Sequence, residues 1–268
     1  MRSATIERQS FRLILVALSL SLMGCGSATD RTLEETVEQF HKIDPTASIS
    51  IKNGDGSIRI YGADTNEMRL QAIKRAYSAK RLKQIAINIS VQPSSVSIET
   101  NFPPKQTWGL FDRSGTVDYT IVVPRTANIS RLELAKGEAS VEEMRGRSVN
   151  ARLGSGRLFD HNCFSNADFA VSRGTLSLAY EWWEPGKFSV QANIADGNVW
   201  ASLPGDAALH LIAETVHGKI ATDITDQDER RAEPITKIDI LVHGGGTAGI
   251  KMHATEGNIE IVEQNPDL

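Results

Sequence analysis

The feature that most constrains this chain is a glycine that returns at a nearly fixed interval through its second half. Each one is flanked by polar residues and followed by a run in which aliphatic and polar residues alternate. The repeated glycines are Gly137, Gly156, Gly174, Gly197, Gly218 and Gly257. Subtracting successive positions gives gaps of 19, 18, 23, 21 and 39 residues, so the last gap is close to two periods. Such a period is the sequence signature of stacked repeats.

The alternation after each glycine predicts strands with one buried and one wet face, and helical spacing is absent after Gly115. One short unit cannot bury its apolar face alone, so neighbouring units must share a core. The predicted fold class is all-β, with short strands stacked at a repeat of about 20 residues, as in a β-solenoid or β-roll. The alternative is an antiparallel β-sandwich, in which the strands flanking each glycine pair with each other.

In the stacked arrangement, equivalent aliphatic residues of successive units form one interior column. That predicted column is Val141, Leu158, Leu176, Val199, Ile220 and Ile259. Bare edges invite association, so residues 47–100 are expected to cover one end of the stack and residues 260–268 the other. The repeated glycines, together with the upstream copy Gly56, are interpreted as structural turn residues.

The first residues read as an export signal. A basic start is followed by an apolar run over residues 13–22, which is too short to span about 30 Å of hydrocarbon as a helix. The sequence Leu22-Met23-Gly24-Cys25 then resembles the bacterial lipobox, which implies cleavage after Gly24 and lipidation of Cys25 with acyl chains such as palmitate. An ordinary signal peptide or short anchor with an unrelated cysteine is the alternative.

These observations predict five segments along the chain. They are a lipoprotein signal peptide at 1–24, a lipidated tether leading into the domain at 25–45, an N-terminal β part at 46–130, the repeat array with its glycine turns at 131–262, and a tail at 263–268. Within the first half we expect a strand at 36–40, with a short helix over 32–40 as the alternative. We also expect a basic connector at 78–84, either helical or irregular, and a long exposed loop at 101–114, which contains the Trp108–Phe111 cluster.

Charge and cysteine content narrow the class further. The 29 basic and 33 acidic residues are well mixed and give a net charge of −4, which argues against a nucleic-acid partner because such partners select basic stripes. The chain has two cysteines, so if Cys25 carries lipid, Cys163 has no partner for a disulfide within the chain. Its neighbour Phe164 favours a buried structural thiol.

Several stretches in series resemble a bacterial β-repeat family of proposed adhesins, the DUF4097 domain. They are the opening Asn53-Gly54-Asp55-Gly56-Ser57-Ile58-Arg59-Ile60, the strand Val117-Asp118-Tyr119-Thr120-Ile121-Val122-Val123-Pro124, and the closing Thr255-Glu256-Gly257-Asn258-Ile259. The likeness covers about residues 46 to 262. It implies an all-β stacked-strand domain, often exported or anchored to the envelope, with no established catalytic activity.

Motifs for chemistry are weak. His217, His243 and His253 lie near turns but lack metal-site spacing, so no metal and no cofactor are predicted. The pairs Glu142/Glu143 and Glu181/Glu184 leave a polysaccharide-active β-helix enzyme as an alternative. Consecutive strand residues point to opposite faces, so one of Trp182 and Trp183 is expected to be exposed, where it could contact a sugar or a protein.

The sequence therefore predicts a non-enzymatic, lipid-anchored β-repeat protein of the bacterial cell envelope that presents an adhesin-like interaction surface. In a cell with two membranes the outer membrane is the expected location, because Gly26 stands where an aspartate signals retention at the inner one. The expected partners are the membrane, through the lipid on Cys25, and an unidentified envelope protein or glycan. A structural or regulatory envelope lipoprotein without a ligand is a further alternative.

Overall fold

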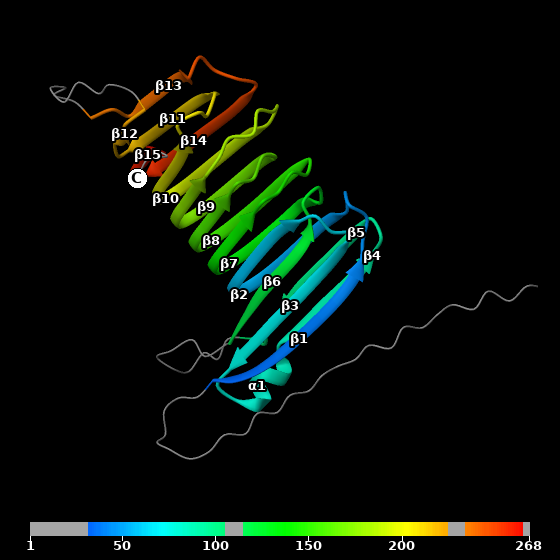
Figure 1. Ribbon diagram of the computed structural model, residues 1–268. Helices are drawn as coiled ribbons and strands as arrows, with labels where there is room; N and C mark the ends of the chain where they lie inside the picture. The colour runs from blue at the N-terminus through cyan, green and yellow to red at the C-terminus, as the bar shows by residue number, and fades with distance from the viewer. Residues whose placement is uncertain (1–31, 105–114, 225–233, 265–268) are drawn as a thin grey trace, which may run out of the picture.

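The computed structural model describes residues 32–104, 115–224 and 234–264, which form one open sheet of 15 strands and one short helix (Figure 1). The predicted all-β class is confirmed. Most of the predicted loop at 101–114, with Trp108 and Phe111, lies outside the described residues.

Five long strands carry the architecture, and each contains a repeat glycine near its middle. They are β2 (Ser48–Ala63), β7 (Asn128–Glu142), β8 (Ser148–His161), β9 (Asn166–Ala179) and β10 (Ser189–Pro204). Neighbours in this series pair in parallel and in register, so that glycine faces glycine across every pair. Hydrogen bonds therefore run between repeats, as the stacked arrangement predicts, and not across the glycine of one repeat as in the antiparallel sandwich.

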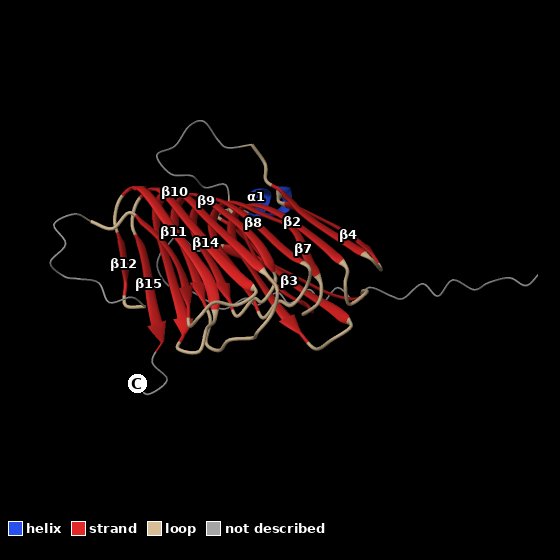
Figure 2. Cartoon of the chain, turned by 90° about the horizontal axis from the view of Figure 1, so that it is seen from above, coloured by secondary structure: helices blue, strands red, loops and turns tan. Residues whose placement is uncertain are grey.

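The strands continue through these five glycines, so the expected turn is a bend within one long strand. First halves pair with first halves and second halves with second halves, which folds the sheet over a single hydrophobic core. Figure 2 shows the long strands stacked side by side with the bent sheet seen from above.

Shorter strands extend both ends of the long-strand series. Beyond β10, the first halves are followed by β14 (Ala248–Glu256), β11 (Leu209–His217) and β13 (Lys237–Val242), and the second halves by β15 (Ile259–Gln264) and β12 (Ile220–Thr222). Before β2, the second half is followed by β6 (Thr116–Pro124), β3 (Glu67–Ala76) and β1 (Leu33–Lys42), and the first half by β5 (Ser95–Asn101) and β4 (Ala86–Gln92).

Several N-terminal expectations are confirmed. The strand expected at 36–40 lies within β1, and the helical connector is α1 (Ala79–Gln84), whose N-cap Ser78 accepts a hydrogen bond from the backbone N–H of Arg81. Residues 47–100 do cover one end of the stack. The expectation for the other end is wrong, because residues 260–264 belong to β15, which pairs with β10 on one side and β12 on the other.

The predicted interior column exists with one substitution. Its members are paired in register and almost fully buried: Ile58, Ala139, Leu158, Leu176, Val199, Ile259 and Ile220, in that spatial order. Ala139 takes the place predicted for Val141, because each member stands two residues after its glycine. Val141 is opposite Asp160 in the next column.

The glycines themselves form a column through the bend. Gly174 has a φ of +134°, and a Cβ added there would overlap the carbonyl oxygen of Gly156. The same overlap recurs between Gly197 and Gly174 and between Gly257 and Gly197. An L-residue is strained at this φ, and the obstructing atom is backbone within a hydrogen-bonded ladder, so it has little freedom to move.

Replacing Gly174 by alanine is therefore expected to lower the free energy of unfolding by at least about 3 kcal/mol, since backbone strain and overpacking add. Gly186→Ala is the matched control, because a Cβ there meets no atom closer than 3.7 Å and φ is not positive. Urea unfolding followed by circular dichroism measures both variants. Equal midpoints for the two variants would contradict the steric explanation.

Candidate functional site at the turns of the array

Three consecutive turns lie side by side at one edge of the array, because the strands that lead into them are parallel and in register. They span residues 143–147 after β7, 162–165 after β8 and 180–188 after β9. Backbone hydrogen bonds continue into them: the N–H of Glu143 donates to His161 and that of Asn162 to Ala179. Glu143 and Asn162 both have positive φ, which turns the chain sharply at the same level of two neighbouring repeats.

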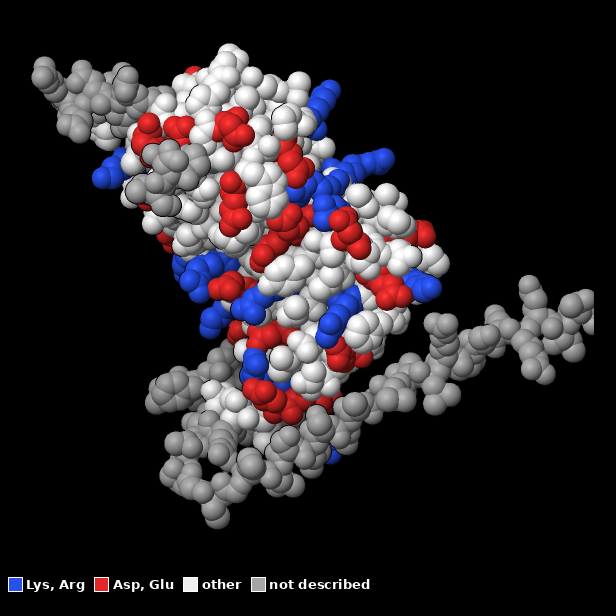
Figure 3. Space-filling model, in the orientation of Figure 1, with Lys and Arg blue, Asp and Glu red and all other residues white. Residues whose placement is uncertain are grey.

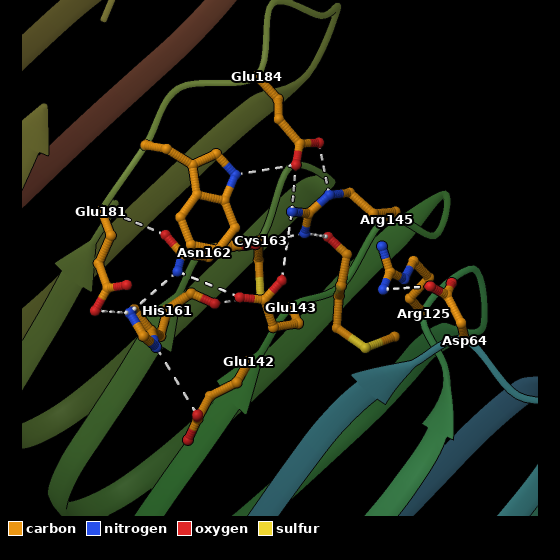
Figure 4. A network of polar contacts seen from close by, with 12 residues as sticks. Asp64, Arg125, Glu142, Glu143, Arg145, His161, Asn162, Cys163, Glu181 and Glu184 are labelled. Atoms are coloured by element: carbon orange, nitrogen blue, oxygen red, sulfur yellow. Dashed lines mark hydrogen bonds and ion pairs between the residues drawn. The ribbon is translucent and has the colours of Figure 1, made fainter.

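Arg145 is the centre of these turns (Figure 4). Its guanidinium makes a bidentate pair with Glu184, at 2.7 Å from Nε and 2.6 Å from Nη2. The same group donates to the carbonyl oxygen of Asn162 and lies 4.5 Å from the ring centroid of Phe164. Planar two-point pairing of this kind fixes both partners, so one arginine ties the three turns together.

The four glutamates of the enzyme alternative do come together at this edge, but each faces a basic side chain. His161 lies between Glu142, 3.8 Å from Nδ1, and Glu181, 3.2 Å from Nε2. Glu143 and Glu184 both lie near Arg145, at 3.5 and 2.6 Å from Nη2. The turns thus hold four carboxylates, each of which contacts either Arg145 or His161.

One of the four, Glu184, differs from the general acid that glycoside cleavage needs. A general acid requires a raised pKa at a carboxyl group that reaches substrate, whereas hydrogen bonds from Arg145 lower the pKa of Glu184. A hollow of about 520 Å³ lies beside Arg145, and its lining contains none of the four glutamates. The residues that line it are Thr46, Thr126, Asn128, Arg145, Gly146 and Arg147.

The two tryptophans divide as expected, although they lie in a loop and not in a strand. Trp183 is buried, with its ring 5.7 Å from that of Tyr180 and 5.5 Å from that of Phe188. Trp182 is 40% exposed, and its indole N–H donates to Glu184 over 3.1 Å. Because Glu184 is itself fixed by Arg145, the exposed indole is held in one orientation.

A buried polar layer lies under the turns, and the sequence reading missed it. Asp160 is fully buried in the column that also contains Val141, and its Oδ2 accepts a hydrogen bond from the hydroxyl of Tyr180 at 3.2 Å. Its Oδ1 has no hydrogen-bond partner among the described residues. Burial raises the pKa of Asp160 to about 7. The signal was present, since Asp160 follows Leu158 by two and so shares its inward face.

Cys163 lies in this buried layer, as predicted for a structural thiol. It is fully buried, and burial raises the pKa of its thiol well above 9.0. Such a thiol carries little thiolate at neutral pH and is poorly reactive.

The remaining predicted sites are dispersed or lie outside the described residues. Cys25 belongs to the part of the chain that the structure does not describe. His217 at the end of β11 pairs with Glu256 on β14. His243, just after β13, pairs with Glu263 on β15. A search of the described ranges for three or more metal-ligating side chains in one place finds no such group. Within those ranges no helix has the length and apolar content to cross a membrane.

The fold and its turns define an all-β protein of stacked parallel repeats. Comparisons with protein-family models and with curated sequences find no match. Among solved structures, a proposed cell adhesion protein from Clostridium sporogenes is similar, with a TM-score of 0.50 at 14% identity over 86% of this chain and 100% of that one.

Two further solved structures show weaker likeness. They are a proposed adhesin from Bacteroides fragilis, with a TM-score of 0.31 at 11% identity over 86% of this chain and 97% of that one, and a proposed lipid-binding protein from Parabacteroides distasonis, with a TM-score of 0.30 at 11% identity over 87% and 97%. At these identities a likeness shows a shared fold alone, and of these three structures the Clostridium one, with a TM-score of 0.50, supports it.

Asp160 predicts a specific pH dependence of stability. Its pKa is 3.8 ordinarily and about 7 when buried in the fold, so the protonated form is favoured by folding. The resulting stability is present below about pH 4 and is lost as the pH rises through 7, a loss of up to about 4 kcal/mol. Tyr180, Cys163, His161 and Arg145 are the titratable groups that act on this carboxyl group.

Asp160→Asn removes this titration, so the variant is expected to gain stability relative to the natural protein between pH 4 and 7 and to keep a constant difference above pH 7. Chemical unfolding at a series of pH values measures that difference. Asp168→Asn, at a half-buried, outward-facing position on β9, is the control. A difference that does not change with pH would contradict a buried, protonated Asp160.

Proposed function

We propose that this chain is a non-enzymatic, lipid-anchored protein of the bacterial cell envelope whose β-array presents an adhesin-like contact surface. The observation that carries the proposal is the Trp182–Glu184–Arg145 arrangement, in which an exposed indole is held at the edge of a rigid stack. An ordered aromatic side chain loses little conformational entropy when a partner covers it, which suits recognition.

The charges at the same edge support a contact role over a catalytic one. Each of the four glutamates contacts Arg145 or His161, and the carboxyl group with a raised pKa, Asp160, is buried away from any substrate. The name of the Clostridium structure, which proposes cell adhesion, agrees with this role. Membership of the DUF4097 family is part of the proposal, and the glycine column is what supports it.

The lipid anchor completes the proposal. Cys25 is eight positions before Leu33, where β1 begins, so a tether between them spans at most about 28 Å. Acyl chains on Cys25 would hold the β1 end of the sheet close to a membrane, with outer-membrane attachment in a two-membrane cell. More than one chain gives stable anchoring, because each buried methylene contributes about 0.8 kcal/mol.

Anchoring is tested by growing cells that express the full chain with a palmitate analogue. The natural protein and Cys163→Ser are expected to take the label, while Cys25→Ser is expected to take none and to leave the membrane fraction. The two cysteine variants differ only in which thiol is lost, so the comparison isolates the acceptor. Label on Cys25→Ser would contradict the anchor.

The contact surface is tested with Trp182→Ala. Loss of one aromatic contact is expected to weaken binding to isolated envelope polysaccharide or to an arrayed glycan by about 1 kcal/mol, or roughly fivefold, with no change in melting temperature. Phe40→Ala is the matched control, since Phe40 is 59% exposed and lies on β1 at the far end of the array. Equal losses in the two variants would remove Trp182 from the surface.

A further inference from the structure

A groove of about 630 Å³ lies on the outer face of the second-half sheet, away from the turns. It crosses β3, β6, β2, β7 and β8, and three members of the glycine column, Gly56, Gly137 and Gly156, are part of its lining. No side chain rises from those three positions, so the groove is hollow where the strands bend. Figure 3 shows the face of Figure 1, on which basic and acidic side chains are mixed.

The basic side chains in this groove outnumber the acidic ones. Arg59 on β2 and Arg157 on β8 share one carboxylate, Glu138 on β7, at 3.7 and 2.8 Å. This sharing follows from the register, since Glu138 is opposite Arg157 and Ser57, and Arg59 is the next outward residue on β2. Two guanidinium groups carry ten N–H donors, and Glu138 offers two oxygens, so most donors remain available.

The opposite wall of the groove is fixed by its own contacts. Asp118 on β6 accepts a hydrogen bond from Ser57 at 2.9 Å and pairs with Arg75, which also pairs with Glu34. The buried side chain of Asn53 on β2 donates to the carbonyl oxygen of Val117 over 2.8 Å and holds β6 against β2. Arg75 is therefore matched by two carboxylates, whereas Arg59 and Arg157 have only that of Glu138 between them.

We propose that this groove binds the carboxylate of an acidic saccharide, with Arg59 and Arg157 as the donors. Guanidinium groups recognise oxyanions by paired, directional hydrogen bonds. The remaining lining suits a sugar better than a peptide: Ser57 and Thr120 supply hydroxyl groups, while Ile73 is the one aliphatic side chain. The groove lies on β3, β6, β2, β7 and β8, whereas Trp182 lies in the loop after β9. The groove can therefore bind a ligand whether or not the Trp182 surface does.

Glu138 then has a defined role as a competitor. In the absence of ligand its carboxylate contacts the guanidinium groups of both arginines, and a ligand carboxylate must displace it. An exposed ion pair of this kind contributes little to the stability of the fold. Replacing Glu138 by the carboxylate of a ligand therefore costs little stability.

The test measures binding of the full-length chain, purified in detergent, to polygalacturonate, with dextran as the neutral polymer. Arg59→Gln and Arg157→Gln are each expected to weaken binding about tenfold, the effect of losing a charge-assisted hydrogen bond. Arg173→Gln is the matched control, because Arg173 is exposed at the same bend but has its own carboxylate, Asp196, at 3.0 Å. It is expected to leave affinity within about twofold of the natural protein.

Removing the carboxylate of Glu138 is expected to change the affinity in the opposite direction. Glu138→Gln is expected to strengthen polygalacturonate binding several-fold, whereas Asp196→Asn, which changes the net charge equally, is expected to leave it unchanged. Equal effects of the groove variants and their controls, equal binding of dextran, or weaker binding by Glu138→Gln would each overturn the proposal. All five variants are at outward positions, so melting curves are expected to match that of the natural protein.

Discussion

From Gly137 onward, each glycine of the column has its α-carbon against the carbonyl oxygen of the glycine in the neighbouring strand, and no larger residue fits between them. Gly156 and Gly174 show this contact at the centre of the array. It fixes where each strand bends and keeps neighbouring strands in the same register. The core column and the row of turns are consequences, because every other residue is placed by its distance from a glycine.

Shared register decides how outward charges meet. Residues at equal distance from their glycines stand side by side, so Arg157 meets Glu138 and Arg173 meets Asp196. Such pairs join neighbouring strands across one strand spacing of about 4.8 Å. The mismatch at Arg59 arises because Ser140, and not an acid, is opposite it on β7. In this array the groove differs from its surroundings in its side chains, while the backbone register there is the same as in the neighbouring strands.

The distance of each residue from its glycine also explains which predictions succeeded. Glycine spacing alone predicted the stacked core, and a strict count of two residues from each glycine would have replaced Val141 by Ala139, which is small but equally buried. The spatial order could not be predicted: β14 and β15 insert between β10 and the earlier strands β11 and β12, and nothing in the sequence marks that return. The turn network also depends on side-chain reach, since Arg145 and Glu184 are 39 positions apart.

The two candidate surfaces are joined by one strand. On β8, Arg157 lies in the groove, Phe159 follows on the same face, and His161 enters the turn network. Four residues of strand cover about 13 Å, so the groove and the turns are within reach of one extended partner. The Phe159 ring lies 5.8 Å from that of His161, which gives this path an aromatic step between Arg157 and the turns. An extended partner with an acid group at the Arg157 end and a ring over Phe159 matches that order, whereas a compact ligand would contact one surface only.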